Sequence, residues 1–163
     1  MAEYWNINED FKSRFEVFLK EKPTPAVTLE SPVTKHDFTN AGNGSAELKR
    51  LLKKLGIDPV VLRKVAVASY EAEINLAAHS EGGVMKSNVH ADLVHIVFED
   101  IGPGIEDIQK ALEPGFSTAI EYVREMGFGA GLGLPNIKKN SDVMHLDSEK
   151  GRNTILEIIT YFK

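Results

Sequence analysis

The chain has 163 residues, a formal net charge of −5 and no cysteine. Its length is typical of one domain, its charge argues against a general nucleic-acid binder, and the lack of cysteine excludes a disulfide framework and thiolate catalysis. We find no signal peptide and no apolar run long enough to cross a bilayer, so we expect a cytoplasmic protein.

The first 31 residues predict an N-terminal extension or arm, set apart from a main domain that spans residues 32–163. Within the arm, Phe11, Phe15 and Phe18 recur at roughly helical spacing, until the prolines of the segment 23–25 end the pattern. The main domain predicts helices at 45–55, 58–79, 106–112 and 132–140, and strands at 33–38, 84–90, 93–99, 142–148 and 153–162.

Local signals support two of these helices. Ser45 is a suitable N-cap for the first helix, and Asp58 followed by Pro59 is typical of the start of the second. Helices and strands occur in mixed order, and the strands form hairpins rather than regular βαβ units. We therefore predict an α/β two-layer sandwich, in which helices cover one face of a mixed, mostly antiparallel sheet.

The second helix carries a polar stripe within Glu71-Ala72-Glu73-Ile74-Asn75. Glu71, Asn75 and His79 are spaced by four, so they share one helix face, whereas Glu73 points elsewhere and is expected to be exposed. A carboxylate can accept a proton from an attacking hydroxyl, and an amide oxygen is a hard ligand that suits Mg²⁺. An ordinary solvated helix face is the alternative, and we expect His79 to be structural rather than a metal ligand.

A second motif, Asp100-Ile101-Gly102-Pro103-Gly104, follows an apolar strand. A carboxylate at Asp100 can accept a hydrogen bond from the exocyclic amine of adenine. Gly102 allows a flat base to approach the backbone, and Gly104 permits a turn with positive φ. A plain turn at the end of a strand is the alternative, because Asp, Gly and Pro all favour turns.

The third motif has glycines at alternate positions: Gly127, Gly129, Gly131 and Gly133. Alternating glycines let successive backbone N–H groups converge on an anion, and the helix that follows points its N-terminus at the same place. The motif therefore predicts a polyphosphate site, with a flexible hinge as the alternative. Between the second and third motifs, Phe116 and Arg124 lie in a segment that resembles a lid.

The order and spacing of the three motifs resemble the N, G1 and G2 boxes of the GHKL ATPase superfamily. The likeness extends over roughly residues 32–163 and is strongest to the bacterial anti-sigma-factor serine/threonine kinases of the stressosome switch-kinase type. It rests on Glu99–Ile108, on Gly115–Thr118 and on Gly129–Leu132. This resemblance implies the Bergerat fold, Mg²⁺ and ATP as cofactors, and a small partner protein of the anti-sigma antagonist kind.

The resemblance also implies a role for each matching residue. Glu71 would be the catalytic base, Asn75 the magnesium ligand and Asp100 the acid that reads adenine. Thr154 would place a hydroxyl near the base. The glycines would shape the nucleotide pocket: Gly102 and Gly104 around the base, and Gly127, Gly129, Gly131 and Gly133 around the phosphates.

The resulting hypothesis is a protein serine/threonine kinase. Two alternatives are a nucleotide-gated binding module that transfers no phosphate, and a detached histidine-kinase catalytic domain. The resemblance further implies a homodimer, which no residue of the sequence indicates on its own.

Overall fold

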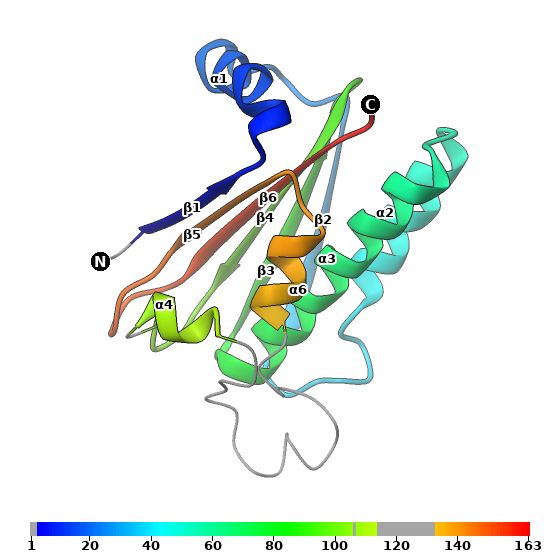
Figure 1. The fold of residues 1–163 in the computed structure, drawn as a ribbon. Helices are drawn as coiled ribbons and strands as arrows, with labels where there is room; N and C mark the ends of the chain where they lie inside the picture. The colour runs from blue at the N-terminus through cyan, green and yellow to red at the C-terminus, as the bar shows by residue number, and fades with distance from the viewer. Residues whose placement is uncertain (1–2, 106, 114–132) are drawn as a thin grey trace.

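The computed structural model describes residues 3–105, 107–113 and 133–163, and Figure 1 shows their arrangement. A six-stranded sheet has the strand order β1-β5-β6-β4-β3-β2, and every pair of neighbouring strands within it is antiparallel. The strands are β1 (Glu3–Ile7), β2 (Val27–Thr34), β3 (Gly82–Val89), β4 (Leu93–Asp100), β5 (Val143–Asp147) and β6 (Ile155–Tyr161). The helices are η1 (Glu9–Phe11), α1 (Lys12–Glu21), α2 (Asn43–Lys54), α3 (Pro59–His79), α4 (Ile108–Ala111) and α6 (Gly133–Lys139).

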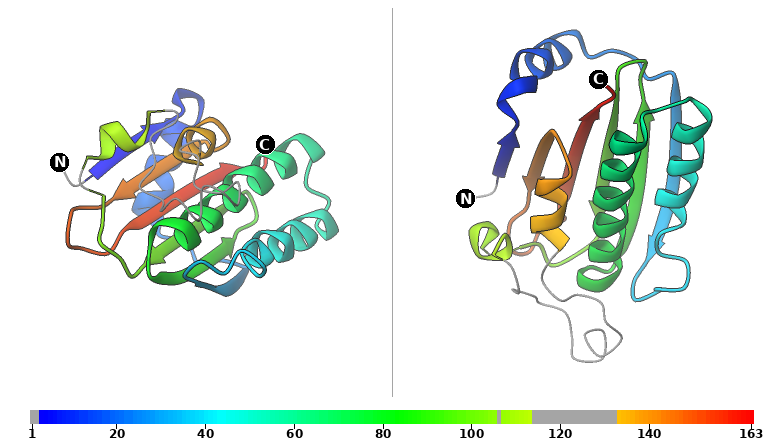
Figure 2. Two further views of the ribbon diagram at one scale, coloured as in Figure 1. Left: turned by 90° about the horizontal axis from the view of Figure 1, so that it is seen from below. Right: turned by 45° about the vertical axis from the view of Figure 1, so that its right-hand side comes forward.

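Helices α2, α3 and α6 pack on one face of the sheet, which confirms the predicted two-layer α/β sandwich (Figure 2). Alternate residues of the strands face these helices, among them Ile96 of β4 and Ile158 of β6, which are each 1% exposed. From the helices, Leu48 and Leu52 of α2 complete the core and are fully buried. This layer fixes the position of α3, the helix that carries the first motif.

The start of α3 follows the prediction, whereas the start of α2 does not. Asp58 is the N-cap of α3 and accepts a hydrogen bond from the Val60 N–H at 2.8 Å. The N-cap of α2 is Gly42 with φ of 101°, and Ser45 lies inside the first turn rather than at the cap. A residue of α3, Glu73, supplies the missing acceptor.

Glu73 is 1% exposed, so the expectation of an exposed side chain was wrong. Its carboxylate accepts hydrogen bonds from the backbone N–H groups of Gly42, Gly44 and Ser45 at 3.0, 3.3 and 2.5 Å, and also from the Ser45 hydroxyl. A carboxylate placed at a helix N-terminus satisfies unpaired N–H groups and is stabilised by the helix dipole. Glu73 therefore links α3 to the start of α2 through these hydrogen bonds.

The N-terminal residues contribute directly to the sheet. β1 pairs with β5 at one edge, and β2 begins at Val27, earlier than the predicted strand at 33–38. The predicted domain boundary between residues 31 and 32 thus lies inside β2. The predicted strand at 33–38 therefore overlaps β2 only at Val33 and Thr34, because the backbone turns after Thr34 and φ of His36 is 56°.

Helix α1 packs against the sheet face opposite α3. Phe15 is buried there beside Leu93, Ile159 and Tyr161, which alternate along their strands with the residues of the main core. Phe11 stacks on the Tyr161 ring with 4.9 Å between centroids. Phe15 and Phe18 lie in α1, as the helical spacing predicts, whereas Phe11 ends η1 and is the N-cap residue of α1. The three rings belong to a second, smaller core.

Beyond α1, this second face carries a polar network that crosses four strands. Glu157 of β6 lies between His95 of β4 and His145 of β5, with N···O distances of 3.0 and 2.8 Å. The other ring nitrogen of His145 lies 3.0 Å from the carboxylate of Glu3 in β1. The Trp5 ring stacks on His145 with 3.8 Å between centroids.

Within the part of the chain that the structure describes, no helix is both long enough and apolar enough to cross a bilayer.

Candidate functional site

A cavity of about 1060 Å³ opens between α3, the end of β4, α4 and the start of α6. This volume is sufficient for a nucleotide-sized ligand. Its walls include the predicted site residues Asn75, Asp100, Gly104, Gly133 and Thr154. The three motifs, which are separated by up to about 60 residues in sequence, therefore contribute to one cavity.

The polar stripe of α3 has the predicted geometry. Glu71, Asn75 and His79 are each partly exposed, whereas the residues between them in α3 are buried. Asn75 and His79 line the cavity, and Glu71 lies one turn before Asn75, outside the lining. One helical turn is about 5–6 Å, so Glu71 stands at the rim of the cavity rather than inside it.

Gly133, the first residue of α6, approaches the Asn75 side chain very closely. A Cβ atom at Gly133 would lie 2.6 Å from both the Nδ2 and Oδ1 atoms of Asn75. The α6 backbone and the Asn75 amide thus occupy adjoining space, and a side chain at position 133 would displace the amide.

Asp100 is tied to β6 through one carboxylate oxygen. Its Oδ1 atom accepts a hydrogen bond from the Thr154 N–H at 2.7 Å, and its own N–H donates to the Thr154 carbonyl at 3.0 Å. Within the described residues, Oδ2 makes no hydrogen bond, so it is available to a ligand in the cavity. Burial raises the pKa of Asp100, against the lowering effect of the Thr154 hydrogen bond, and the neighbouring charge of Glu99 raises it further.

The two glycines of the second motif allow close backbone packing at this end of the cavity. A Cβ atom at Gly102 would lie 3.2 Å from the Cβ atom of Ser80 and 3.5 Å from Asp100 Oδ1. Gly104 has φ of 75°, and a Cβ atom there would overlap the carbonyl oxygens of Glu149 and Arg152. Gly104 has the predicted positive φ. In addition, the β5–β6 turn lies so close to Gly104 that no side chain would fit there.

The sequence analysis missed Ser148, which joins these segments. Its hydroxyl lies 2.5 Å from the Thr154 Oγ1 atom and accepts a hydrogen bond from the Ile105 N–H at 2.8 Å. Ser148 is fully buried. No sequence motif marks it, because the second motif lies more than 40 residues away along the chain.

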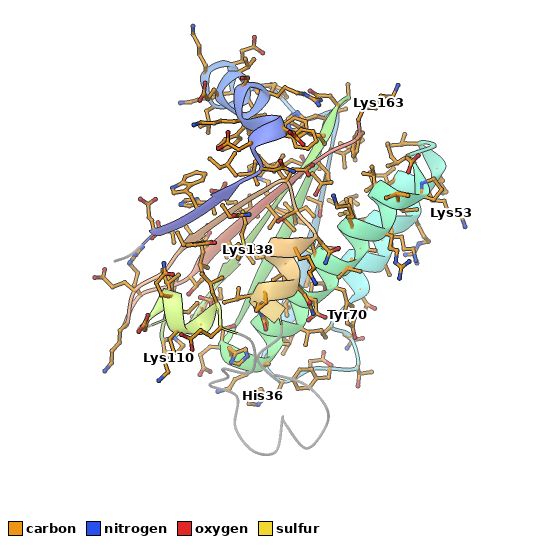
Figure 3. All side chains as sticks on the ribbon, in the orientation of Figure 1. His36, Lys53, Tyr70, Lys110, Lys138 and Lys163 are labelled. Carbon is orange, nitrogen blue, oxygen red and sulfur yellow. The ribbon has the colours of Figure 1, made fainter. Side chains whose placement is uncertain are left out.

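Other cavity residues that the sequence analysis missed are of two kinds. Apolar side chains from several elements form one part of the wall, including Leu76, Phe98, Ile108, Leu134 and Leu146. Lys110 of α4, which Figure 3 labels near one end of the sheet, lines the cavity together with Lys150. The predicted glycines Gly127, Gly129 and Gly131 lie outside the described residues, as do Phe116 and Arg124 of the lid-like segment.

The donor atoms in the cavity fit a magnesium–nucleotide complex better than a metal site built from protein alone. Among the described residues, no group of three or more His, Cys, Asp or Glu side chains could hold a metal ion. Mg²⁺ that accompanies a nucleotide commonly takes one or two protein ligands and fills its shell with phosphate oxygens and water. The amide oxygen of Asn75 is suited to that partial role.

Sequence comparison finds curated relatives, among them a serine/threonine-protein kinase and anti-sigma F factors, although no family model matches the chain. The chain is 31% identical over 119 residues to the serine/threonine-protein kinase RsbT of Bacillus subtilis (strain 168), which covers 71% of this chain and 84% of RsbT. It is 29% identical over 112 residues to the anti-sigma F factor of Thermoanaerobacter sp. (strain X514), covering 64% of this chain and 75% of that protein.

A solved structure shares the fold. A chain in the crystal structure of the SiaB–SiaC complex from Pseudomonas aeruginosa matches with a TM-score of 0.53, at 12% sequence identity, over 92% of this chain and 96% of that chain. At this identity the match supports the architecture alone.

Proposed function

The chain belongs to the GHKL-fold family of anti-sigma-factor serine/threonine kinases, and from this premise we propose that it transfers the γ-phosphate of ATP to a serine or threonine of a small partner protein. The partner that we propose is a domain of the anti-sigma antagonist type. Because sigma-factor regulation takes place in the cytoplasm, we propose that the protein acts there. The observation that carries the proposal is the stripe of α3, which places Glu71 at the rim of a cavity lined by Asn75 and Asp100.

In this proposal, Asp100 and Thr154 bind the adenine end of the nucleotide. The free Oδ2 atom of Asp100 accepts a hydrogen bond from the exocyclic amine, while the Thr154 N–H holds Oδ1 in place at 2.7 Å. The Ser148 hydroxyl orients the Thr154 hydroxyl beside it. This end of the cavity therefore selects adenine, because guanine presents an oxygen where adenine presents the amine.

At the other end of the cavity, Asn75 would hold Mg²⁺ through its amide oxygen. Bound Mg²⁺ would neutralise charge that develops on the phosphates during transfer. Gly133 leaves room for the Asn75 side chain at the junction of α3 and α6, where an added Cβ atom would overlap the amide. We propose that Gly127, Gly129 and Gly131 complete the phosphate site.

Glu71 would accept the proton from the attacking hydroxyl of the partner. Its position at the rim suits a nucleophile that arrives on another protein, because a side chain deep in the cavity could not reach it. General-base catalysis of this kind typically contributes about 10²–10⁴-fold in rate.

The test of this proposal is the variant Glu71→Ala. Purified protein, labelled ATP, Mg²⁺ and purified antagonist-type domains of the source organism are mixed, and label on the domain is followed. We expect wild type to transfer label, and Glu71→Ala to lose at least about 100-fold in rate with ATP affinity unchanged, because Glu71 does not line the cavity.

Two results would contradict the proposal. Wild type that binds ATP but labels no domain would show a nucleotide-gated binding module instead of a kinase. Label that acid removes would indicate phosphorylation of histidine, and hence a histidine-kinase catalytic domain.

A further inference from the structure

The outward face of α3 is unusually apolar for an exposed helix. Val60, Arg63, Val67 and Tyr70 follow one another at spacings of three and four residues, and so form a stripe away from the sheet. Val60 is 70% exposed and Tyr70 is 45% exposed. A surface helix ordinarily carries polar residues on its solvent side, so this stripe is better suited to contact with another protein.

Exposed cations lie on α2 and α3, the two helices at this side of the molecule. Lys49, Arg50 and Lys53 of α2 and Arg63 of α3 are all exposed, and none of them makes an ion pair with the described part of the chain. In residues 43–70, Lys and Arg outnumber Asp and Glu by six to two, whereas the whole chain has 19 basic and 24 acidic residues. The helix dipole accounts for basic residues in the last turn of α2, but not for Lys49, Arg50 or Arg63.

Helices α2 and α3 pack side by side, so their exposed side chains contribute to neighbouring parts of the surface (Figure 1). Figure 3 labels Lys53 near the α2–α3 turn and Tyr70 farther along α3 towards the cavity. The turn itself adds Leu55, which is 55% exposed. We call this surface the α2–α3 face and define it by Lys49, Arg50, Lys53, Leu55, Val60, Arg63 and Tyr70.

We propose that the α2–α3 face is the docking surface for the partner protein, and that the partner presents an acidic surface around an apolar centre. This proposal rests on the proposed function, and it adds the place and chemistry of partner recognition. The cations of this face would attract an acidic surface, and the exposed Val60, Leu55 and Tyr70 offer it apolar contact.

The location of the face suits delivery of a hydroxyl to Glu71. Val60 and Glu71 are eleven residues apart on the same helix, which corresponds to about 16 Å along the axis. A domain of about 100 residues has a radius of gyration near 13 Å, so one that covers Val60 and Tyr70 also extends over Glu71. The stripe therefore leads from the docking surface to the rim of the cavity.

Charge argues against a second copy of this chain as the occupant. A two-fold dimer through the α2–α3 face would bring the cations of one copy towards those of the other, since both copies use the same surface. Like charges that face each other across an interface are strongly unfavourable. A nucleic acid is also a poor occupant, because the chain as a whole is acidic and the centre of the face is apolar.

The test compares two triple charge reversals. Lys49→Glu, Arg50→Glu and Arg63→Glu alter the α2–α3 face. Lys12→Glu, Lys20→Glu and Lys86→Glu alter exposed cations on α1 and β3 and change the net charge equally. Binding of the same purified antagonist-type domains is measured by fluorescence anisotropy with a non-hydrolysable ATP analogue, and sedimentation reports the oligomeric state.

We expect the face variant to bind a domain at least about tenfold more weakly than wild type, and the control variant to remain within about twofold. Added salt should weaken binding of wild type more than that of the face variant. ATP-analogue affinity should not change in either variant, which shows that both are folded.

Equal binding by wild type and the face variant would overturn the docking surface, as would the absence of binding by every domain tested. A wild-type dimer that the face variant loses would instead assign this face to self-association. If label reaches a domain that wild type and the variant bind equally, the kinase proposal stands and the docking proposal fails. If a domain binds through this face without being labelled, the docking proposal stands and the kinase proposal fails.

Discussion

Two carboxylates of α3 show how local environment gives different roles to the same residue type. Glu73 and Glu71 are two positions apart on α3, yet Glu73 is buried against the start of α2 whereas Glu71 is partly exposed at the cavity rim. In Asp100, the two carboxylate oxygens have different roles. Oδ1 accepts a hydrogen bond from the Thr154 N–H, whereas Oδ2 is left for a ligand. The structural and the ligand-binding roles of Asp100 can therefore be separated by experiment.

Asp100→Asn should lose nucleotide affinity without losing stability. Because burial raises the pKa of Asp100, the ionised carboxylate costs folding free energy at any pH above its folded pKa, and that cost disappears as the pH falls through it. Asparagine carries no charge and can still accept from the Thr154 N–H. At pH 7 we expect a Tm at or above that of wild type by calorimetry, with ATP affinity reduced at least about tenfold by titration.

A lower Tm combined with unchanged ATP affinity would contradict this assignment of Asp100, and would leave it a purely structural residue.

At the scale of elements, the loop after β4 depends on the turn between β5 and β6. The Gly151 N–H donates to the Pro103 carbonyl at 2.6 Å, and the Ile105 N–H donates to the Ser148 hydroxyl at 2.8 Å. Gly104 lies between these two contacts. The floor of the cavity therefore consists of two segments that must fit together, not of one motif.

Gly104→Ala tests this fit, and Gly151→Ala is its matched control. Both glycines have positive φ, at 75° and 85°, but an added Cβ atom meets backbone oxygens at Gly104 and open space at Gly151. We expect Gly151→Ala to cost about 1–2 kcal/mol from backbone strain alone. Gly104→Ala should cost roughly 3 kcal/mol or more by urea unfolding, and should also weaken ATP binding. Equal costs for the two variants would mean that the two segments do not constrain each other.

The sequence predicts those elements whose signals are local. The start of α3 at Asp58 and Pro59 is such a case, and so is the stripe of Glu71 and Asn75, since helical periodicity alone places both residues on one face. The capping of α2 could not be predicted, because its acceptor, Glu73, lies 28 residues after Ser45. Likewise, nothing near Ser148 in the sequence indicates that it supports Thr154.

The N-terminal residues illustrate the same limit for the fold. The phenylalanine spacing predicts α1 correctly, yet it cannot show that this helix covers the sheet face opposite α3 or that β1 pairs with β5. Those placements depend on residues more than 70 positions later for α1 and more than 100 positions later for β1. In the site, the motifs predicted that Asn75, Asp100 and Gly133 lie together, whereas the apolar wall comes from tertiary packing.

At the scale of the whole molecule, the sheet separates two different surfaces. One face holds the main core and the cavity, and the other holds α1 and the network of His95, Glu157 and His145. In that network, side chains add a second link between β4, β6 and β5, beside the backbone pairing of the strands. Because it is partly buried, it should contribute to the stability of the whole sheet in a pH-dependent way.

Hydrogen bonds from His95 and His145 lower the pKa of Glu157 from its ordinary value of 4.5 to about 2. The folded state thus favours the ionised form, and the resulting stability is complete above pH 4.5 and is lost as the pH falls towards 2. We expect Glu157→Gln to lower the free energy of unfolding by about 1–2 kcal/mol at pH 6, after allowance for partial exposure.

The difference between wild type and Glu157→Gln should shrink as denaturant titrations are repeated from pH 4.5 downwards. A difference that stays constant across this range would show that ionisation of Glu157 does not stabilise the sheet.

The stacking of Trp5 on His145 has a practical consequence for spectroscopy. Trp5 is the single tryptophan of the chain, it lies in the edge strand β1, and it is 43% exposed. Intrinsic emission therefore reports whether β1 is paired with β5, and not directly the state of the cavity or of α3. Fluorescence and circular dichroism coincide during unfolding only if this edge separates together with the rest of the sheet. An earlier fluorescence transition would identify β1 as the first strand to detach.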